Sequence, residues 1–399
     1  MVVSLPRVTS ESSIASLSDV VAVLERMYEP GWAREWDAVG LAAGDPAQPV
    51  RRVLLAVDPA PSVVEEALAW RADLLLTHHP LLLQGVHSVA TTSPKGRALH
   101  QLIRGGCALY TAHTNADAAA PGVSDALARV LGLTDLVPLS ADPGEPIDKL
   151  VTFVPESALD KVIDALSSAG AGEIGEYSRC AWSVVGAGTF IPGEHATPSI
   201  GAAGERETVS EHRLEMIVPR VRRIEALTAL RTAHPYEEVA ADVYELASWS
   251  GVRGIGRVGR LDTPVTLRDF AMLAAEALPA TSQGVRVAGD PGAEVSRIAV
   301  CGGSGDSLFD AVRAAEADVF VTADLRHHPA SELRDDAGDG PPYLVDVAHW
   351  ASEWPWLAGV SNRLEGAMEA AGTPIEVLIS NRCTDPWVFR VPSPGGMVR

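Results

Sequence analysis

Six of the eleven histidines in this 399-residue chain lie in four short motifs, and two of these motifs also carry a carboxylate. The motifs hold His78 and His79 in "LLLTHHP", His113 and Asp117 in "AHTNAD", His327 and His328 in "LRHHP", and His349 and Glu353 in "HWASE". A spacing of four puts the last two side chains on one face of a helix, with their Cβ atoms about 5–6 Å apart. These residue types are those that bind divalent metal ions.

Each motif alone also has a simpler interpretation. An imidazole at a strand end is often a structural residue, and Asn and Asp in loops commonly bond their own backbone. An HxxxE pair can be a solvated helix face. Together, however, the motifs all follow predicted strands of one architecture. Imidazole and carboxylate ligands without thiolate favour Zn, Fe, Mn, Ni or Co over Ca or Mg, and about five such ligands suit two ions.

The elements that position these motifs alternate between strands and helices. Strands are predicted at 51–58, 72–79 and 107–113, and helices at 61–71, 95–106 and 122–133. This alternation predicts an α/β layer with a mainly parallel sheet and helices outside it. Ligand sites in such sheets lie at the carboxyl ends of strands, and the motifs with His78 and with His113 are both at such ends.

A second kind of pattern interrupts this layer. The stretch "VPLSADPGEPID" at 137–148 is interpreted as a linker. From 149 to 246 the predicted order is βαββαβ, which is typical of a ferredoxin-like domain. The glycine-rich "GVRGIGRVGR" at 251–260 is interpreted as a connector, because its glycines do not open a helix after a strand. His234, in "AHPYEE", lies inside this unit and outside the metal motifs.

The α/β pattern then resumes, so the chain is predicted as two α/β halves, 1–147 and 247–399, that form one metal-site domain around an inserted domain at 148–246. The halves share a short similarity, since "RADLLLTHHP" in the first corresponds to "EADVFVTADLRHHP" in the second. Each has a buried strand after an acidic turn, followed by His-His-Pro. A repeated plan would give this similarity, and so would coincidence over so short a stretch.

Composition excludes several classes of function. With 52 acidic and 32 basic residues the formal charge is −20, which argues against nucleic acid as a partner. No apolar run approaches the length of about 20 residues that crosses a bilayer, and the N-terminus shows no secretory signal. We therefore expect a soluble, cytoplasmic protein. The four cysteines are far apart in the sequence and are expected to be reduced.

Several of these blocks resemble the signatures of a known family. "WDAVGLAAGD", "THHP", "HTNAD", "TADLRHH" and "VDVAHWASE" resemble the NGG-interacting-factor-three-like proteins, a dinuclear metal centre family whose members are often labelled GTP cyclohydrolase type 2 homologues. The match runs over both α/β halves. The segment with "GAGTF" and "AHPYEEVAADVYEL" resembles the PII/CutA-like domain that longer bacterial members carry.

The resemblance implies two divalent ions per chain and a homohexameric assembly. Its implied metal ligands are His78, His79, Asp117, His349 and Glu353, with the glutamate bridging both ions. The family's Thr-Gly-Asp is Thr-Ala-Asp here, at 322–324, and His327 replaces an expected tyrosine. Because alanine allows fewer backbone conformations than glycine, the roles of Asp324 and His328 are open.

Two functions follow from this site. One is a metal-dependent hydrolase acting on a nucleotide, a phosphoester or a related ring, with His113 or His328 carrying protons. Its substrate would be a small anion. The cyclohydrolase label implies GTP as that substrate, but the sequence shows no guanine-specific pocket. The alternative is a metal-binding, metal-delivery or sensing protein without catalysis.

Overall fold

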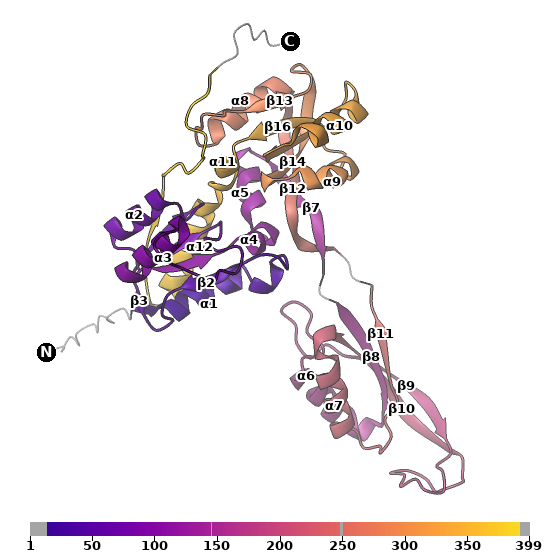
Figure 1. The fold of residues 1–399 in the computed structure, drawn as a ribbon. Helices are drawn as coiled ribbons and strands as arrows, with labels where there is room; N and C mark the ends of the chain where they lie inside the picture. Colours follow the sequence, from indigo (N-terminus) through magenta and orange to yellow (C-terminus); the bar gives the residue numbers. More distant parts are fainter. Residues whose placement is uncertain (1–13, 145, 248–249, 392–399) are drawn as a thin grey trace, which may run out of the picture. The chain divides into compact units, whose positions relative to one another are not determined.

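The computed structural model describes residues 14–144, 146–247 and 250–391, which fold as two units (Figure 1). One unit combines the described residues up to Asp142 with those from Val252 onwards. The other, Pro143–Gly251, is an insertion within the first, against an expected range of 148–246. The predicted α/β class is confirmed at this level, because the chain forms several sheets with helices around them.

A five-stranded sheet carries the first two histidine motifs. Its order is β17-β4-β5-β6-β2, in which the first four strands are parallel and β2 is antiparallel to β6. The strands are β2 (Gly40–Ala43), β4 (Arg52–Ala56), β5 (Leu74–Thr77), β6 (Ala108–Thr111) and β17 (Glu376–Ile379). Every residue of β5 and β6 is buried, as expected of parallel strands with both faces covered.

Helices cover both faces of this sheet. Along β4, Leu54 and Ala56 pack against one helix group, whereas Val53 and Leu55 face the other. The first group is α2 (Pro61–Trp70) and α3 (Pro94–Gly105); the second is α1 (Leu17–Met27) and α12 (Trp356–Ala370), with α5 (Val123–Val130) packed beside α12 in the same core. The ends of α3 follow from its sequence, because the Ser93 side chain caps its start and Gly106 ends it in the left-handed conformation.

A six-stranded sheet carries the remaining motifs. Its order is β13-β16-β15-β14-β12-β7, with β14, β15 and β16 parallel. The strands are β7 (Thr134–Pro143), β12 (Ser250–Thr266), β13 (Arg286–Ala288), β14 (Glu294–Ser304), β15 (Val319–Ala323) and β16 (Tyr343–Val347). The helices beside it in the sequence are α8 (Leu267–Ala277), α9 (Phe309–Ala314), α10 (His327–Ala337) and α11 (His349–Glu353).

Shorter elements complete this unit: strands β1 (Ala15–Ser16) and β3 (Pro49–Val50), helix α4 (Thr114–Ala118), and the 3₁₀ turns η1 (Pro30–Trp32) and η4 (Asp306–Leu308). Two further 3₁₀ turns, η2 (Glu156–Ala158) and η3 (Arg220–Arg222), belong to the inserted unit.

The two sheets repeat one local plan. Asp73 precedes β5 and Asp318 precedes β15, and each carboxylate accepts backbone N–H bonds of 2.7–2.9 Å from two consecutive residues near the start of the neighbouring strand, β4 or β14. Two residues before each aspartate, Arg71 and Glu316 take left-handed backbone angles with φ of 58° and 50°. The shared turn geometry supports the repeat indicated by the sequence.

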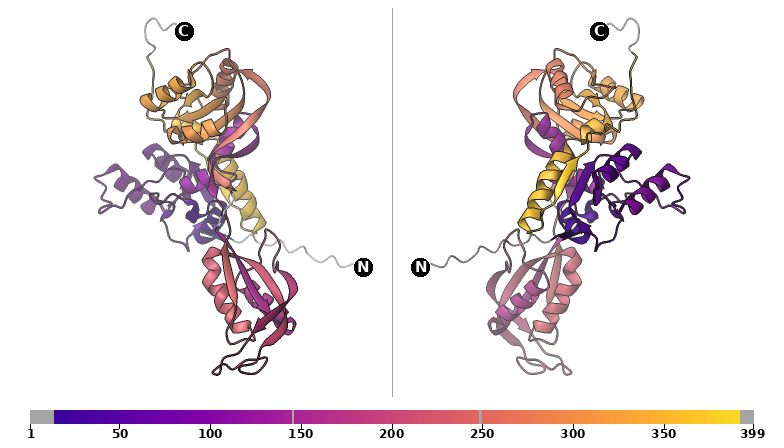
Figure 2. Two further views of the ribbon diagram at one scale, coloured as in Figure 1. Left: turned by 90° about the vertical axis from the view of Figure 1, so that its right-hand side faces the viewer. Right: turned by 90° about the vertical axis from the view of Figure 1, so that its left-hand side faces the viewer.

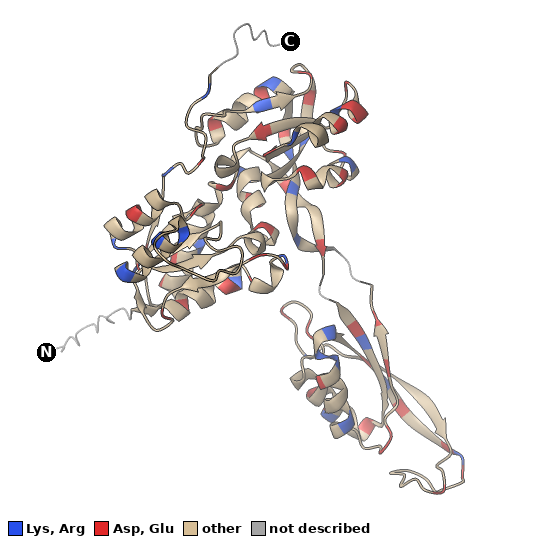
Figure 3. Cartoon of the chain, viewed as in Figure 1, with Lys and Arg blue, Asp and Glu red and all other residues tan. Residues whose placement is uncertain are grey.

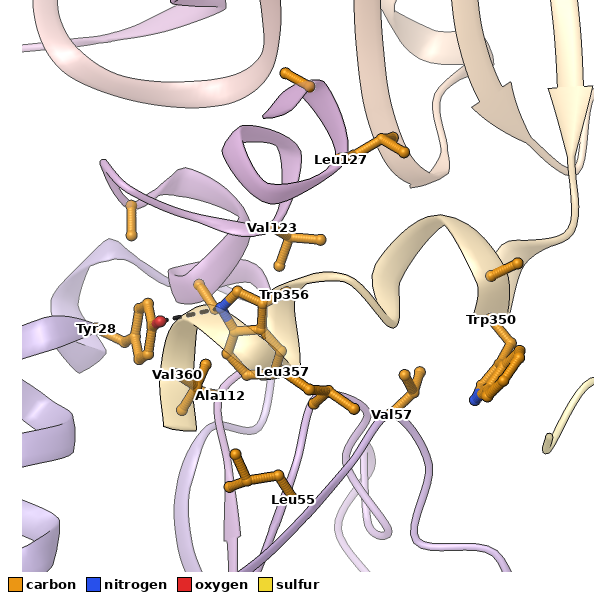
Figure 4. Close-up of a cluster of buried hydrophobic side chains, with 14 of the residues drawn as sticks. Tyr28, Leu55, Val57, Ala112, Val123, Leu127, Trp350, Trp356, Leu357 and Val360 are labelled. Atoms are coloured by element: carbon orange, nitrogen blue, oxygen red, sulfur yellow. Dashed lines mark hydrogen bonds between the residues drawn. The ribbon is translucent and has the colours of Figure 1, made fainter. Parts of the chain in front are cut away.

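The sheets do not separate along the sequence, however. Helix α12 and strand β17 come from the C-terminal segment but pack with the first sheet, whereas α5 and β7 come from the N-terminal segment and join the second. The buried side chains between them form one core, in which the Trp356 indole donates a 3.0 Å hydrogen bond to the Tyr28 hydroxyl (Figure 4). Both halves of the sequence are thus needed to build the unit that carries the histidine motifs.

The inserted unit is a four-stranded antiparallel sheet with the order β11-β8-β10-β9. Helices α6 and α7 both lie on one of its faces and share a core with β8 and β10 (Figures 1 and 2). In chain order the elements are β8 (Ile147–Val154), α6 (Leu159–Ser168), β9 (Trp182–Phe190), β10 (Glu207–Pro219), α7 (Arg223–Ala233) and β11 (Ala241–Glu245).

Two sequence interpretations are wrong. Most of the supposed linker at 137–148 lies in β7 and β8, and the supposed connector at 251–260 lies within the 17-residue strand β12. In this strand glycine allows β12 to lie close to β7. A Cβ on Gly254 would lie 2.2 Å from the Ser140 carbonyl oxygen, and one on Gly259 would lie 2.7 Å from the Leu136 side chain. Because β7 and β12 approach this closely, glycine marks a strand pair.

In the described part of the chain, no helix combines the length and apolar character needed to cross a bilayer. Acidic and basic residues are interspersed along the elements of both units (Figure 3).

Candidate metal centre

The ends of β5 and β6 position the first three histidines. The backbone N–H of His78 bonds the Ala56 carbonyl at 3.2 Å, and that of His79 bonds the Val57 carbonyl at 2.8 Å, so pairing with the chain of β4 continues past the end of β5. His113 follows β6 and directly precedes α4. The three imidazoles pack on one another, with ring centroids 5.0–5.5 Å apart.

The second sheet supplies the other members of the cluster. His349 begins α11, two residues after β16, and Glu353 ends this helix one turn later. The His349 Nε2 lies 3.0 Å from Glu353 Oε1, so the predicted geometry of the HxxxE pair is present. The His349 ring centroid is 5.2 Å from that of His79, and this contact joins the motifs of the two sheets.

The Glu353 carboxylate lies at the middle of the cluster and is only 3% exposed. Its Oε1 is 3.5 Å from His78 Nε2, and its Oε2 is 3.3 Å from His79 Nε2. Asp117 contributes a further oxygen, 3.7 Å from His78 Nε2. Among the described residues Oε2 is buried without a hydrogen-bond partner. A buried carboxylate oxygen that has no hydrogen-bond partner and lies beside imidazole nitrogens is typical of a metal-binding site.

Each imidazole of the cluster has an acceptor at its outer nitrogen. The Nδ1 atoms of His79, His113 and His349 lie 2.6–2.8 Å from carboxylate oxygens, and the Nδ1 of His78 lies 2.9 Å from the Ala112 carbonyl oxygen. The carboxylates are, in the same order, Asp58, Asp37 and Asp324. A proton on Nδ1 is therefore held outward, which leaves the Nε2 lone pair free toward the centre. Outer-shell acceptors fix metal-binding histidines in this way.

The charges inside this cluster are strongly coupled. Burial alone would raise the pKa of Glu353, but His79, His78 and His349 hold it well below its usual range. Burial would likewise lower the pKa values of the histidines, yet the Glu353 carboxylate raises that of His349 to about 9 and that of His79 to about 11. Burial raises the pKa of Asp117. In the absence of metal the cluster therefore retains protons that a bound cation would displace.

Two overlapping groups have the geometry to hold an ion. His78, His79 and His113 form one, and His79, His349 and Glu353 form the other; within each, one ligand atom from every residue lies within 4.8 Å of the others. Of the predicted ligands, the structure thus brings His78, His79, His349 and Glu353 together, with Asp117 beside His78. His113, predicted as a proton carrier, lies where a ligand would.

His328 is not brought to this cluster. It is exposed in the first turn of α10, and no contact found in the described residues joins it to the other histidines of the centre. Asp324, whose role is open from sequence, orients His349. It takes a left-handed backbone with φ of 56°, which aspartate tolerates. Ala323 ends the buried strand β15 ahead of it, so the replacement of glycine by alanine is accommodated.

Three residues of the site have no role assigned from sequence. Asp37 and Asp58 are the acceptors already described. Gly303 has φ of +68°, and an added Cβ would lie 2.6 Å from Glu353 Oε1 and 3.1 Å from His349 Nε2. Two sequence features could have identified these aspartates: Asp58 follows strand β4 closely, and Asp37 lies in the "WDAVG" block. Beside them, the Trp36 indole is 61% exposed with its ring centroid 6.0 Å from that of His113.

Comparisons with known proteins agree over most of the chain. A family model described as Duf34/NIF3 (NGG1p interacting factor 3) matches residues 15–386. Two proteins named GTP cyclohydrolase 1 type 2 homolog are similar: one from Mycobacterium tuberculosis is 49% identical over 376 residues, covering 93% of this chain and 96% of its own length, and one from Bacillus subtilis is 35% identical over 370 residues, covering 93% and 97%. A crystal structure of a Bacillus cereus protein related to NIF3 matches with a TM-score of 0.74 at 35% identity, covering 95% of this chain and 100% of the other.

Proposed function

Since this chain belongs to the Duf34/NIF3 family, we propose that it is a dinuclear divalent-metal protein that hydrolyses a small anionic substrate of the nucleotide, phosphoester or related ring class. The observation that carries the proposal is the buried Glu353 carboxylate, which faces three imidazole Nε2 atoms while its Oε2 has no hydrogen-bond partner in the described part of the chain.

The residues present fit two ions. His78, His113 and Asp117 would hold one ion, His79 and His349 the other, and Glu353 would contact both. A donor set of imidazole and carboxylate without thiolate suits Zn, Fe, Mn, Ni or Co. When bound, two such ions supply Lewis acidity and lower the pKa of coordinated water.

The chain's own residues do the positioning. Asp37, Asp58 and Asp324 keep the Nδ1 proton of their histidine partners outward. Gly303 keeps the space beside Glu353 and His349 clear, because any side chain there would collide with ligand atoms. We assign His113 to the ligand set, since Asp37 occupies one of its nitrogens and the other remains for an ion.

These outer carboxylates also determine the net charge of the centre. Two divalent ions with Asp117 and Glu353 alone would leave a positive excess that attracts anions. Asp37, Asp58 and Asp324 offset that excess, so the cluster as a whole is close to neutral. An anionic substrate would therefore be selected by direct contact with the ions.

For the inserted unit we propose a ferredoxin-like, PII/CutA-like domain. Its element order βαββαβ, its sheet order with β8 and β10 central, and its two helices on one face support this proposal. No proposed ligand of the metal centre lies within it.

The test is metal content and turnover on one preparation. The parent should carry up to two transition-metal ions per chain by elemental analysis, and should hydrolyse at least one substrate in a panel that includes bis(p-nitrophenyl) phosphate, nucleotides and GTP. His79→Ala should lose metal and activity together, while His87→Ala, an exposed histidine outside the cluster, should keep both. Full metal content in His79→Ala would contradict the site. Two bound metals without turnover on any substrate would favour a binding or delivery role.

A further inference from the structure

The inserted unit contains a cavity of about 750 Å³ on the face of its sheet opposite α6 and α7. Phe153 of β8, Val184 of β9 and Arg213 of β10 form part of its wall, and Phe190 and Ile191 add apolar surface. The segments 196–200 and 236–240 close its side. Cavities of this size, largely apolar with a few polar groups, are typical of small-molecule sites.

Two glycines give this cavity a flat floor. Gly186 and Gly188 alternate on β9, and their side of the strand faces the cavity. A Cβ on Gly186 would meet no atom within 4 Å, so the space above it is open. A Cβ on Gly188 would lie 2.0 Å from the Glu211 Oε2, so the carboxylate takes the place that a side chain would fill. The floor can thus accept a planar group lying beside a carboxylate.

The polar groups of the cavity, Glu211 and Tyr236, lie beside each other and lack a cationic partner in the part of the chain that the structure describes. Glu211 is only 8% exposed, and none of the ion pairs found among the described residues includes its carboxylate. The Tyr236 hydroxyl is buried and has no hydrogen-bond partner in that part of the chain. Burial, and then the neighbouring Glu211, raise the pKa of Tyr236. Buried polar atoms left this way are costly unless a ligand satisfies them.

The balance of charge selects the kind of ligand. Arg213 is the basic residue of the lining, but its guanidinium already pairs with Glu215 at 3.0 Å and lies over the Phe153 ring. Glu237 and Glu238 lie on the same wall as Tyr236, and Glu237 accepts a 3.0 Å bond from the Thr197 backbone that holds the side segment in place. A cation would therefore meet unpaired negative charge, whereas an anion would be repelled.

We propose that this cavity binds a small organic cation in which a planar apolar body carries a protonated amine or amidine. The body lies over Gly186 and Gly188 against the apolar wall, the cationic nitrogen pairs with Glu211, and Tyr236 provides the second polar contact. This site is separate from the metal centre in residues and in chemistry. It does not depend on the proposed hydrolysis.

The test uses the full-length, metal-loaded protein and two probes of equal shape, cationic benzamidine and neutral benzamide, measured by calorimetry. Benzamidine should bind saturably at one site per chain and about tenfold or more tighter than benzamide, since one charge-assisted contact separates the two. Glu211→Gln should remove that difference, and Gly186→Val should abolish binding by filling the floor. Glu173→Gln, an exposed acid of the same unit, is the matched control.

Thermal unfolding and metal content should match the parent in each variant, which separates loss of the cavity from loss of the fold. Tyr236→Phe, which removes only the hydroxyl, gives a milder second variant and should weaken benzamidine binding. Equal binding of the two probes, unchanged benzamidine affinity in Glu211→Gln, or no binding to the full-length protein would each overturn the proposal.

Discussion

Replacing Glu353 by glutamine probes the middle of the metal centre. Glutamine keeps the size of the side chain and one acceptor oxygen, but it removes the charge that faces His78, His79 and His349. It also removes one of the two oxygens through which the residue would contact both ions. Because loss of an outer-shell partner alone typically costs about 10–100-fold in metal affinity, loss of this inner carboxylate should cost at least that much. We expect occupancy to fall to one ion per chain or fewer, and any hydrolytic activity to fall with it.

The same change should also destabilise the metal-free protein. From its position in the sequence, Glu353 is predicted to begin a helix at a cavity edge, but it ends α11 and is 3% exposed. At an effective dielectric constant of about 20, an ion pair at the observed 3.3 Å to His79 is worth about 5 kcal/mol before desolvation is subtracted. Removing one partner of a buried pair costs about 3–5 kcal/mol, and we expect a loss of unfolding free energy in this range at pH 6.

The raised pKa values of the histidines determine how the difference in unfolding free energy changes with pH. The folded pKa values of His349 and His79 are raised to about 9 and about 11, so their stabilising effect is fully present below the unfolded value of 6.5. That effect is lost as pH rises through the folded values. The difference in unfolding free energy between the metal-free parent and the metal-free variant should therefore be largest near pH 6 and smaller at pH 9.

Elemental analysis and thermal unfolding of chelator-treated and metal-reloaded protein measure both effects. Glu369→Gln, an exposed glutamate on α12, is the control and should resemble the parent in each. Two ions retained in the Glu353 variant would remove this residue as the shared ligand. A stability difference that does not depend on pH would show that the carboxylate does not hold the histidines protonated.

Three further predictions concern the surroundings of the centre. Asp58→Asn should lower metal affinity about 10–100-fold, measured by competition with a chromogenic chelator, because it weakens the acceptor that orients His79; an affinity equal to the parent's would contradict this role. Replacing the unit Pro143–Gly251 by a short linker should leave metal content unchanged, as no proposed ligand lies there, and loss of metal in a folded variant would show otherwise. Light scattering of the full-length protein should give the mass of a hexamer, the assembly implied by the family resemblance, and a monomer would count against it.

Much of the secondary structure is predictable because local pattern determines it. The apolar run before His78 predicts β5, and the end signals Ser93 and Gly106 bound α3, since burial on both faces and capping leave direct traces in the sequence. Strand pairing leaves no such trace. Nothing in the residues of β17 indicates that it pairs with β4 more than 300 positions earlier, or that two sheets form instead of one. The glycines of β12 mislead for a related reason, because their use depends on the closeness of β7.

The predictability of the metal centre has the same limit. His78, His79, His349 and Glu353 stand out because ligands concentrate at strand ends and at helix spacing. Asp37 does not, because its partners His113 and Thr114 lie more than 70 positions away. Outer-shell residues are recognisable only once the fold brings them to their partners. For His328 the error is the opposite one. Its His-His-Pro motif resembles "THHP" and suggests a site residue, but the residue is exposed at the start of α10.

The repeated plan places different residue types at one equivalent point of the two sheets. His79 stands six residues after Asp73, and Asp324 stands six residues after Asp318, so the two occupy the same point of the repeated turn-strand plan. In the first sheet this point presents an imidazole toward the centre. In the second it presents a carboxylate that holds the outer nitrogen of His349 instead. The two copies thus contribute, at the same point, an imidazole that faces Glu353 and a carboxylate that orients His349. At this point the second copy has Thr-Ala-Asp, and its aspartate takes a left-handed backbone that this residue type tolerates.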